Sequence, residues 1–443
     1  MVEAINPCQA GFVPGRHTSD SIIIVWEVIR TLISCRGWTR YVALKLDLEK
    51  AYDRLKWHFI QETLEFFQLP STLITLIMNM ISSTRFHVLW NGSPLPEVVP
   101  SRSIRQGDPL SPYLFIFCLE RLSIKLAEVV CDKLIHLISF RGWVCLSHLF
   151  FADDIFLFTR ATFRDCKNFG KILLNFCESS DQLMSVTKSR VWFSPRTPRR
   201  IKEQLAGILG LPTTGNIGTY LGTPIFTTRR IASSYQYLVD NICKCIEGWQ
   251  IKYLSMAGQA TLIKASITSI PTYAMQTTLL PQKICHHIDK LSCNFLWGGS
   301  KHHRSCHTVK WATVTLPKEA GGLGIPSIRH RNHAILMNQA WRLFSNPTSL
   351  WAQVFQAKYF PQDTLFTNPR TSRGSHIWTA LSIGVKLLRG GMHWIIGDGQ
   401  TIQIWQDPWL PNGSLHSYIK GPLPPPPSHE EDKRVNALWS NHS

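Results

Sequence analysis

The stretch HLFFADDIFLF, residues 148–158, constrains the fold of this chain more than any other. Its two adjacent acids, Asp153 and Asp154, lie between apolar runs that each predict a buried strand. Successive side chains of a strand point to opposite faces, so the two acids share one site only if the chain reverses there as a hairpin. Two carboxylates at an apolar tip repel each other and lose hydration, and a divalent cation relieves both costs. The stretch therefore predicts a metal site, with an ordinary Asp-Asp turn as the alternative.

A third acid stands at the end of another predicted strand. In RYVALKLDLEKAYDRLKW, residues 40–57, Val42, Leu44 and Leu46 alternate with other residues, and a helical periodicity follows. Asp47 therefore lies at the carboxyl end of a strand, where functional groups gather in mixed folds. If this strand neighbours the hairpin, three carboxylates meet. Such a set holds two Mg²⁺ ions for in-line phosphoryl transfer, which predicts nucleotidyl transfer or phosphodiester hydrolysis.

The composition favours a nucleic-acid partner. The 443 residues include 47 Lys and Arg against 29 Asp and Glu, which gives a formal charge of +18. A field of this size attracts phosphate backbones, although membrane surfaces and other acidic partners attract it too. The sequence shows no signal peptide and no apolar run long enough for a membrane span, and its twelve cysteines are scattered. We therefore expect an intracellular protein, nuclear or cytoplasmic, in a reducing compartment.

The remaining pattern predicts helices with a few short strands. A helix should begin near Ser19 or Asp20, which are cap-type residues. Pro and basic residues from position 195 indicate a boundary, and TYLGTPI (219–225) indicates a short strand and a turn. Residues 236–345 are mainly helical in pattern, and the C-terminal tail is rich in proline.

Cysteines and histidines gather between residues 285 and 307. They are Cys285, His286, His287, Cys293, His302, His303, Cys306 and His307. No C-x-x-C pair or ordered histidine pair completes the spacing of a zinc finger. We interpret the cluster as a basic, partly exposed helix and loop, with a zinc site as the alternative.

Five ordered motifs carry a family resemblance. They are LDLEKAYDRLKW, SIRQGDPLSPYLF, FFADD, the lysine of VTKSRVWFS, and YLGTPI. In this order they resemble the palm motifs of reverse transcriptases from non-LTR (LINE-type) retrotransposons, especially those of plants. NPCQAGFVPGRHTSDSI upstream and GWQIKYLSMAGQATLIKASITSIPTYAM downstream resemble the flanking segments of the same family. The resemblance covers nearly the whole chain.

The resemblance implies an α+β right-hand polymerase fold, in which helices pack on the antiparallel sheet of a palm. Residues 1–225 would form this palm with partial fingers, residues 226–345 a helical thumb-like region, and residues 346–443 a post-thumb region with a Pro-rich tail.

The chain also departs from the family's pattern. It begins at MVEAINPCQ, so most of the fingers and the preceding endonuclease are expected to be absent, and it ends before the Cys/His segment that often follows. We interpret it as a truncated copy. Asp181 follows Ser180 where these elements usually carry glycine, which leaves the local turn open.

The resemblance assigns the catalytic chemistry to individual residues. Asp47, Asp153 and Asp154 match the acids that bind two Mg²⁺ ions, which Mn²⁺ can replace, and the backbone carbonyl of Leu48 matches a further ligand. Lys188 resembles the lysine proposed to approach the pyrophosphate leaving group, with an ordinary surface lysine as the alternative.

Other matching residues would contact the substrates. Tyr52 is placed like the aromatic that excludes the 2′-hydroxyl of a ribonucleotide, with a core aromatic as the alternative. Arg105, Gln106 and Gly107 resemble the loop that lies against the template and the incoming nucleotide, where glycine permits close backbone approach. Gly222 resembles the turn that grips the primer end.

The implied function is RNA-directed DNA polymerisation, with an RNA template, a DNA primer and deoxynucleoside triphosphates as partners. A non-catalytic nucleic-acid-binding remnant is the alternative, because the missing fingers carry basic residues that hold the triphosphate. A two-metal nuclease is disfavoured, because a hydrolase has no need of RQGDPLSP or of an aromatic ring at Tyr52.

Overall fold

The chain folds into two compact units. The computed structural model describes residues 4–35, 39–225, 232–249, 254–298, 306–361, 365, 374–400 and short stretches between 402 and 438. Unit 1 comprises Met1–Arg230 and Thr348–Lys358, and unit 2 comprises Ile231–Pro347 and Tyr359–Ser443. The division into three domains after residues 225 and 345 stays a prediction.

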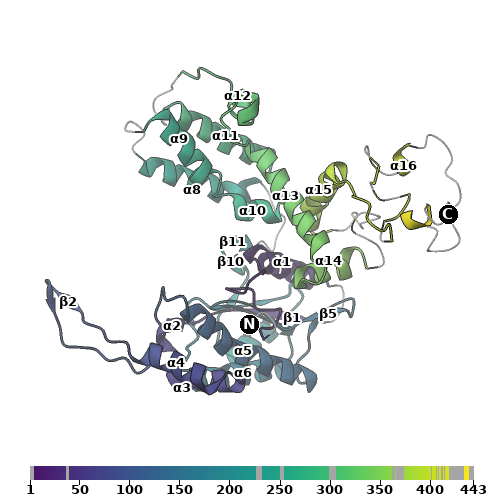
Figure 1. The fold of residues 1–443 in the computed structure, drawn as a ribbon. Coiled ribbons are helices and arrows are strands. Elements are labelled where there is room, and N and C mark those ends of the chain that lie inside the picture. The colour runs from purple at the N-terminus through teal and green to yellow at the C-terminus, as the bar shows by residue number, and fades with distance from the viewer. Residues whose placement is uncertain are drawn as a thin grey trace. The chain divides into compact units, whose positions relative to one another are not determined.

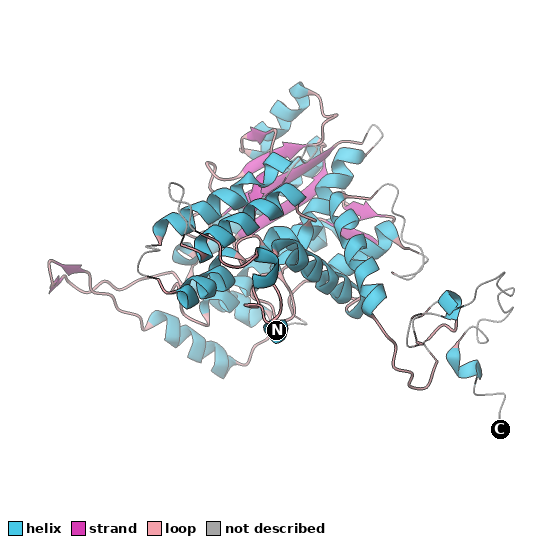
Figure 2. Ribbon diagram, turned by 90° about the horizontal axis from the view of Figure 1, so that it is seen from above, coloured by secondary structure: helices cyan, strands magenta, loops and turns pink. Residues whose placement is uncertain are grey.

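A five-stranded sheet lies at the centre of unit 1 (Figure 2). Its order is β6-β7-β1-β8-β9, with antiparallel pairs except for the parallel pair β8–β9. The strands are β1 (Tyr41–Asp47), β6 (His148–Phe151), β7 (Asp154–Arg160), β8 (Arg190–Phe193) and β9 (Thr213–Thr214). Together with the helices around it, this sheet confirms the predicted α+β class.

The boundary predicted near residue 195 is wrong. Pro198 precedes helix α7 (Arg199–Leu209), and β9 beyond that helix pairs with β8 of the same sheet. Parallel neighbours need a crossover connection, and α7 supplies it. The proline and basic residues therefore mark the start of a helix inside unit 1 and not its end.

Helices cover the apolar face of the sheet (Figure 1). They include α3 (Trp57–Phe66), α5 (Ser111–Cys131) and α6 (Phe163–Ser180). Leu44, Leu46 and Leu157 of the strands are fully buried in one cluster with Leu119 and Phe169 of the helices. Strand side chains alternate between faces, so the residues between these leucines point to the other side.

The remaining elements of unit 1 are short helices and hairpins, apart from the long helix α1 (Thr18–Ser34), which begins one residue before the predicted start. The helices are α2 (Ala51–Arg54) and α4 (Ser71–Ser82). The hairpins are β2–β3 (Leu89–Trp90 and Ser93–Pro94), β4–β5 (Ile138–Phe140 and Val144–Leu146) and β10–β11 (Gly218–Tyr220 and Thr223–Ile225). The β2–β3 hairpin projects away from the sheet (Figure 1).

Unit 2 is helical, as the pattern of residues 236–345 predicts. Its elements are η1 (Ala232–Tyr235), α8 (Gln236–Gly248), α9 (Met256–Leu262), the π-helical η3 (Ile263–Ile267), α10 (Thr272–Thr277), α11 (Gln282–Leu296), α12 (Trp311–Val314), η4 (Lys318–Ala320), α13 (Ile328–Ser345), α15 (His376–Gly391), α16 (Leu415–Tyr418) and η6 (Val435–Leu438). Helix α14 (Leu350–Tyr359) belongs to unit 1 except for its last residue. Among the helices described, none combines the length and apolarity that crossing a membrane requires.

Asn332 of α13 is a buried amide that organises the core of unit 2. Its Oδ1 accepts from the Leu280 amide at 2.8 Å, and its Nδ2 donates to the carbonyl oxygens of Met275 and Thr278 at 3.1 and 3.0 Å. These three bonds satisfy a buried polar group, which explains its place in an otherwise apolar interior.

The Cys/His cluster lies partly on α11. Cys285 and Cys293 are buried on this helix, and Cys293 Sγ lies 3.7 Å from His307 Nδ1. His302 and His303 lie outside the described residues. The helix of our interpretation is thus present, and the role of the cluster stays a prediction.

Candidate active site

Two of the three predicted acids lie on neighbouring strands. Strands β1 and β7 pair antiparallel with Asp47 opposite Asp154. Opposite residues in such a pair have Cα atoms about 4.5–5.5 Å apart. Alternation places both acids, with Lys45 and Phe156, on the face opposite to buried Leu46. One end of the sheet thus carries Asp47, Asp154 and the turn that precedes Asp154.

That turn, residues Ala152 and Asp153, is called the acidic turn below. Phe151 pairs with Asp154 across it, so the predicted hairpin reverses within two residues. Ala152 has a φ of 50°. This left-handed conformation is costly for a residue with a Cβ atom, so the surroundings must hold it in place.

The charges at this end of the sheet act on one another. Burial raises the pKa of Asp154, Lys45 lowers it, Asp153 and Asp47 raise it, and Lys188 lowers it. A pKa raised by desolvation and like charges records an environment that disfavours the carboxylate. A bound cation removes that penalty, and carboxylate oxygens are the ligands that hard divalent ions prefer. The donor set therefore fits a divalent metal.

Asp47 is paired with a lysine in this structure. Lys188 Nζ lies 3.4 Å from Asp47 Oδ1, and the Lys188 side chain is 69% exposed. As they stand, the described residues contain no group of three or more His, Cys, Asp or Glu side chains that could hold a metal ion. An exposed ion pair is worth at most about 1 kcal/mol. A cation can therefore compete for the Asp47 carboxylate at little cost.

The backbone on either side of Asp47 is fixed by a neighbouring loop. The Asp47 amide donates to Ser189 Oγ at 3.1 Å, and its carbonyl accepts from the Ser185 amide at 2.8 Å. Leu48, the predicted backbone ligand, is buried and forms an isolated bridge with Met184. These contacts hold the strand end that presents the carboxylate.

Tyr52 lies on α2 at the edge of the core. Its ring stacks on Phe115, with centroids 5.0 Å and planes 16° apart, and the residue is half-buried. Burial raises the pKa of Tyr52, and the charge of Asp153 raises it further. Tyr52 is thus within electrostatic reach of the acidic turn, and its role in sugar selection stays a prediction.

The loop at residues 105–107 is joined to the Tyr52 segment. The Ile104 amide donates to the Tyr52 carbonyl at 3.0 Å. All three loop residues are exposed, and Gly107 has a φ of 91°, which favours glycine. A cavity of about 270 Å³ lies beside the loop and is lined by, among others, Met80, Phe86, Arg105, Asp108 and Ser111.

Gly222 lies in a second two-residue turn, which joins β10 and β11. Its two central residues, Leu221 and Gly222, have φ values of 47° and 74°. A type I′ turn requires positive φ at both positions. The sequence YLGTPI therefore forms the strand and turn that it predicts, as a hairpin.

Lys45 and Tyr220 lie on the sheet face that carries the acids, and the sequence motifs did not single them out. Lys45 Nζ donates to the carbonyl oxygen of Thr219, and the Tyr220 ring meets Phe156 edge to face with centroids 4.9 Å apart. These contacts tie the β10–β11 hairpin to the sheet face that carries the acids. Strand alternation contains the signal for Lys45, since it precedes Asp47 by two residues and shares its face.

Asp181 keeps the turn in which the family usually has glycine. It caps α6 with a φ of 61°, the left-handed conformation that glycine adopts at helix ends and that aspartate tolerates better than most residues. Its carboxylate pairs with Arg54 at 3.9 Å, with Lys56 at 3.8 Å and with Arg102. The departure at this position therefore preserves the local backbone.

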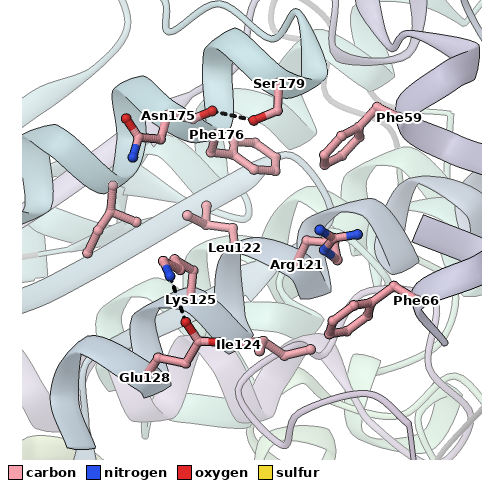
Figure 3. Close-up of a pocket in the computed structure, with 11 residues that line it drawn as sticks. Phe59, Phe66, Arg121, Leu122, Ile124, Lys125, Glu128, Asn175, Phe176 and Ser179 are labelled. Atoms are coloured by element: carbon pink, nitrogen blue, oxygen red, sulfur yellow. Dashed lines mark hydrogen bonds and ion pairs between the residues drawn. The ribbon is translucent and has the colours of Figure 1, made fainter. Parts of the chain in front are cut away.

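A pocket of about 320 Å³ lies between α3, α5 and α6 (Figure 3). In it, the Arg121 guanidinium lies 4.4 Å from the centroid of the Phe66 ring, and Lys125 pairs with Glu128 at 2.7 Å. Its described lining includes none of the predicted site residues. Since these helices pack on the apolar face of the sheet, the pocket is separate from the acids.

A mainly antiparallel sheet with helices packed on one face has the layout expected of a polymerase palm. The profile of the family described as "Reverse transcriptase (RNA-dependent DNA polymerase)" matches residues 1–255, more than half of the 443 residues. The chain belongs to the reverse transcriptase family.

Curated proteins also match parts of this chain. A putative ribonuclease H protein of Arabidopsis thaliana is 36% identical over 205 residues, which cover 45% of this chain and 33% of that protein. A retrovirus-related Pol polyprotein from a type-2 retrotransposable element of Drosophila melanogaster is 31% identical over 153 residues, covering 34% of this chain and 14% of that protein. The chain thus matches a third or less of the length of either relative.

Among solved structures, a telomerase from Candida albicans is 12% identical to this chain. The match covers 79% of this chain and 55% of the telomerase chain, with a TM-score of 0.36.

Proposed function

We propose that this chain is the catalytic core of an RNA-directed DNA polymerase from a LINE-type retroelement. One observation carries the proposal: in a chain of the reverse transcriptase family, Asp47 and Asp154 are paired across neighbouring strands, with Asp153 in the adjoining turn. Carboxylates gathered in this way at a strand end are suited to two-metal phosphoryl transfer.

Asp47, Asp153 and Asp154 would hold the divalent ions, with the Leu48 carbonyl as a further ligand. The proposal takes these ions as two Mg²⁺, with Mn²⁺ as a substitute. Ions held by these residues would supply Lewis-acid activation of the attacking hydroxyl and charge stabilisation at the leaving oxygen. Lys188 would balance negative charge at the pyrophosphate leaving group, and its ion pair with Asp47, 3.4 Å from Nζ to Oδ1, supports this role.

The substrates in this proposal are an RNA template, a DNA primer and deoxynucleoside triphosphates. The exposed loop at residues 105–107 would lie against the template and the incoming nucleotide. Tyr52 would lie beneath the sugar, and Gly222 would contact the primer end. The charge of +18 supports binding to the nucleic-acid backbone. Such binding releases counterions, so the affinity for primer–template should fall steeply with salt.

Primer extension on an RNA template tests the proposal directly. The purified chain, Asp153→Asn and the control Asp132→Asn are compared with Mg²⁺ or Mn²⁺, and duplex binding is measured in parallel. Asp132 is exposed at the end of α5, so its loss should change nothing. We expect extension by the wild type and the control, and binding without extension by Asp153→Asn.

Two results would overturn the proposal in different ways. Extension by Asp153→Asn would show that other groups carry the chemistry. Duplex binding by the wild type without extension in either metal would assign the chain to the non-catalytic remnant.

A further inference from the structure

Residues 8–11 run alongside the strand that leads into the acidic turn. The Ala10 amide donates to the Phe150 carbonyl at 3.0 Å, and the Phe150 amide donates to the Cys8 carbonyl at 2.8 Å. Gln9 and Phe150 form a parallel bridge. The N-terminal segment thus extends the sheet beyond β6, on the strand that ends at the acids.

The Gln9 side chain is directed at the backbone of the acidic turn. It is 1% exposed, and its Oε1 accepts from the Gly11 amide at 2.9 Å and from the Ala152 amide at 3.3 Å. Its Nε2 is buried without a hydrogen-bond partner among the described residues. Burying an amide in this way costs free energy. The amide is retained because its oxygen accepts from the Gly11 and Ala152 backbone amides, bonds that an apolar side chain could not make.

Gly11 is in contact with the same turn. A Cβ atom at this position would lie 2.6 Å from the Ala152 nitrogen and 3.2 Å from the Phe151 carbonyl carbon. Its φ is not in the left-handed region, so lack of space and not backbone conformation requires glycine. The segment therefore contacts Ala152 through a side-chain hydrogen bond and through direct backbone packing.

Arg16 holds the segment in shape. Its Nη1 donates to the carbonyl oxygens of Asn6 and Gln9, and its Nη2 donates to the Ile5 carbonyl at 2.8 Å. One guanidinium therefore fixes three carbonyl groups of the loop. A loop fixed in this way can impose a conformation on what it contacts.

We propose that residues 8–11 clamp the acidic turn and that Gln9 is a positioning residue for Asp153 and Asp154. The clamp holds Ala152 at its φ of 50° and so sets the directions of the two carboxylates before metal binds. Gln9 would thus play the part of an outer partner that orients metal ligands. This inference rests on the proposed metal-dependent polymerase.

Mn²⁺ binding to the full chain without nucleic acid tests the clamp. Free Mn²⁺ is measured by its electron paramagnetic resonance signal for the wild type, Asp153→Asn, Gln9→Met and Gly11→Ala. Gln9→Met keeps the length of the side chain and removes its accepting oxygen. Asn332→Ala, which removes three hydrogen bonds in unit 2, controls for loss of a buried amide, and Gly207→Ala, where a Cβ meets nothing within 4 Å, controls for Gly11→Ala.

We expect Gln9→Met and Gly11→Ala to weaken Mn²⁺ binding about tenfold to a hundredfold, as loss of outer partners of metal ligands does. Both controls should bind as the wild type does, even where Asn332→Ala lowers the melting temperature. If Gln9→Met does not fold, Gln9→Asn decides, because it retains a buried amide and draws the oxygen back from Ala152.

The clamp and the proposed function fail in distinguishable ways. Equal Mn²⁺ binding by the wild type and Asp153→Asn would remove the metal site and with it the proposed function. Loss of binding in Asp153→Asn, together with wild-type binding in folded Gln9 variants, would overturn the clamp alone.

Discussion

The acidic turn and the β10–β11 turn have the same length and are held in different ways. Each joins two antiparallel strands through two residues, and the first of these, Ala152 or Leu221, has a φ of 50° or 47°. The second residues differ, because Gly222 is also left-handed and Asp153 is not. In the β10–β11 turn glycine therefore occupies one of the two left-handed positions without steric cost, whereas the acidic turn contains no glycine. The acidic turn is held by residues 8–11, which are far away in the chain.

The difference follows from what each turn presents. A turn that must offer a carboxylate cannot fill its positions with glycine, so contacts from elsewhere must hold a backbone that local preference disfavours. A turn that offers only backbone can use glycine. Changes at residues 8–11 should therefore disturb the acidic turn, while the β10–β11 turn should respond mainly to its own residues.

The largest expected effect is the loss of primer extension when an acid beside the acidic turn is replaced. Asp154→Asn should remove primer extension, because a metal ligand is lost. It should also raise the free energy of unfolding at neutral pH without metal, because burial raises the pKa of Asp154 and an amide avoids that cost. The difference in unfolding free energy between the variant and the wild type should grow as pH rises through the raised pKa of Asp154.

Extension assays and thermal melts check this prediction, with Asp132→Asn as the exposed control. A variant that still extends primers, or one that melts below the wild type at neutral pH, would contradict it.

The second prediction concerns Tyr52 and the selection of the sugar beside the acidic turn. If its ring lies beneath the sugar, Tyr52→Val should admit ribonucleotides while deoxynucleotide extension continues. Since the ring also stacks on Phe115, a loss of up to roughly 3 kcal/mol of stability is expected from the cavity. The ratio of ribonucleotide to deoxynucleotide incorporation is the measurement. An unchanged ratio with a lowered melting temperature would make Tyr52 a core aromatic only.

The next prediction concerns Glu120, a buried acid that interacts with the Asn6 backbone and with Arg16, the residue that holds the clamp segment. This side chain is 3% exposed, and burial raises its pKa to about 7, although the Asn6 backbone, Ser123 and Arg16 act to lower it. Between pH 4.5 and 7 the folded chain therefore retains a proton that the unfolded chain has lost, so Glu120 costs stability increasingly as pH rises.

The free energy of unfolding of Glu120→Gln should therefore rise relative to that of the wild type between pH 4.5 and pH 7. The total rise should be on the order of 3 kcal/mol. Denaturant unfolding of both proteins across this range measures the gap. Buried His148, whose pKa burial lowers to about 4, is common to both and cancels in the difference. A gap that does not change with pH would contradict the prediction.

The smallest effects concern the turns themselves. Gly222→Ala should lower the free energy of unfolding by about 1–2 kcal/mol, because its φ of 74° is left-handed. A clash would not contribute, because no atom lies within 4 Å of a Cβ there. Gly215→Ala, equally open but without a positive φ, is the matched control. Ala152→Gly should change stability by less than about 1 kcal/mol, since relief of strain and added chain entropy oppose each other. Equal losses at Gly222 and Gly215 would remove the argument from turn conformation.

Local sequence pattern was sufficient to predict much of the structure around the acids. Alternation and composition predicted β1, the hairpin after residue 148 and the end of the sheet at which Asp47 lies, because each depends on neighbouring residues. The contact between Gln9 and Ala152 joins positions 143 residues apart, and no local period encodes it. The boundary near residue 195 failed for a related reason, since only pairing with β8 shows that β9 continues the sheet.

The central claim is that Asp47, Asp153 and Asp154 hold the catalytic metal. Anomalous diffraction at the manganese edge, from crystals of the chain grown with primer–template and Mn²⁺, locates that metal directly. We predict a peak within about 2.5 Å of a carboxylate oxygen of Asp47 and of at least one of the other two acids, the distance range of direct ligands. Manganese bound elsewhere in the chain, with no peak between these acids, would contradict the claim.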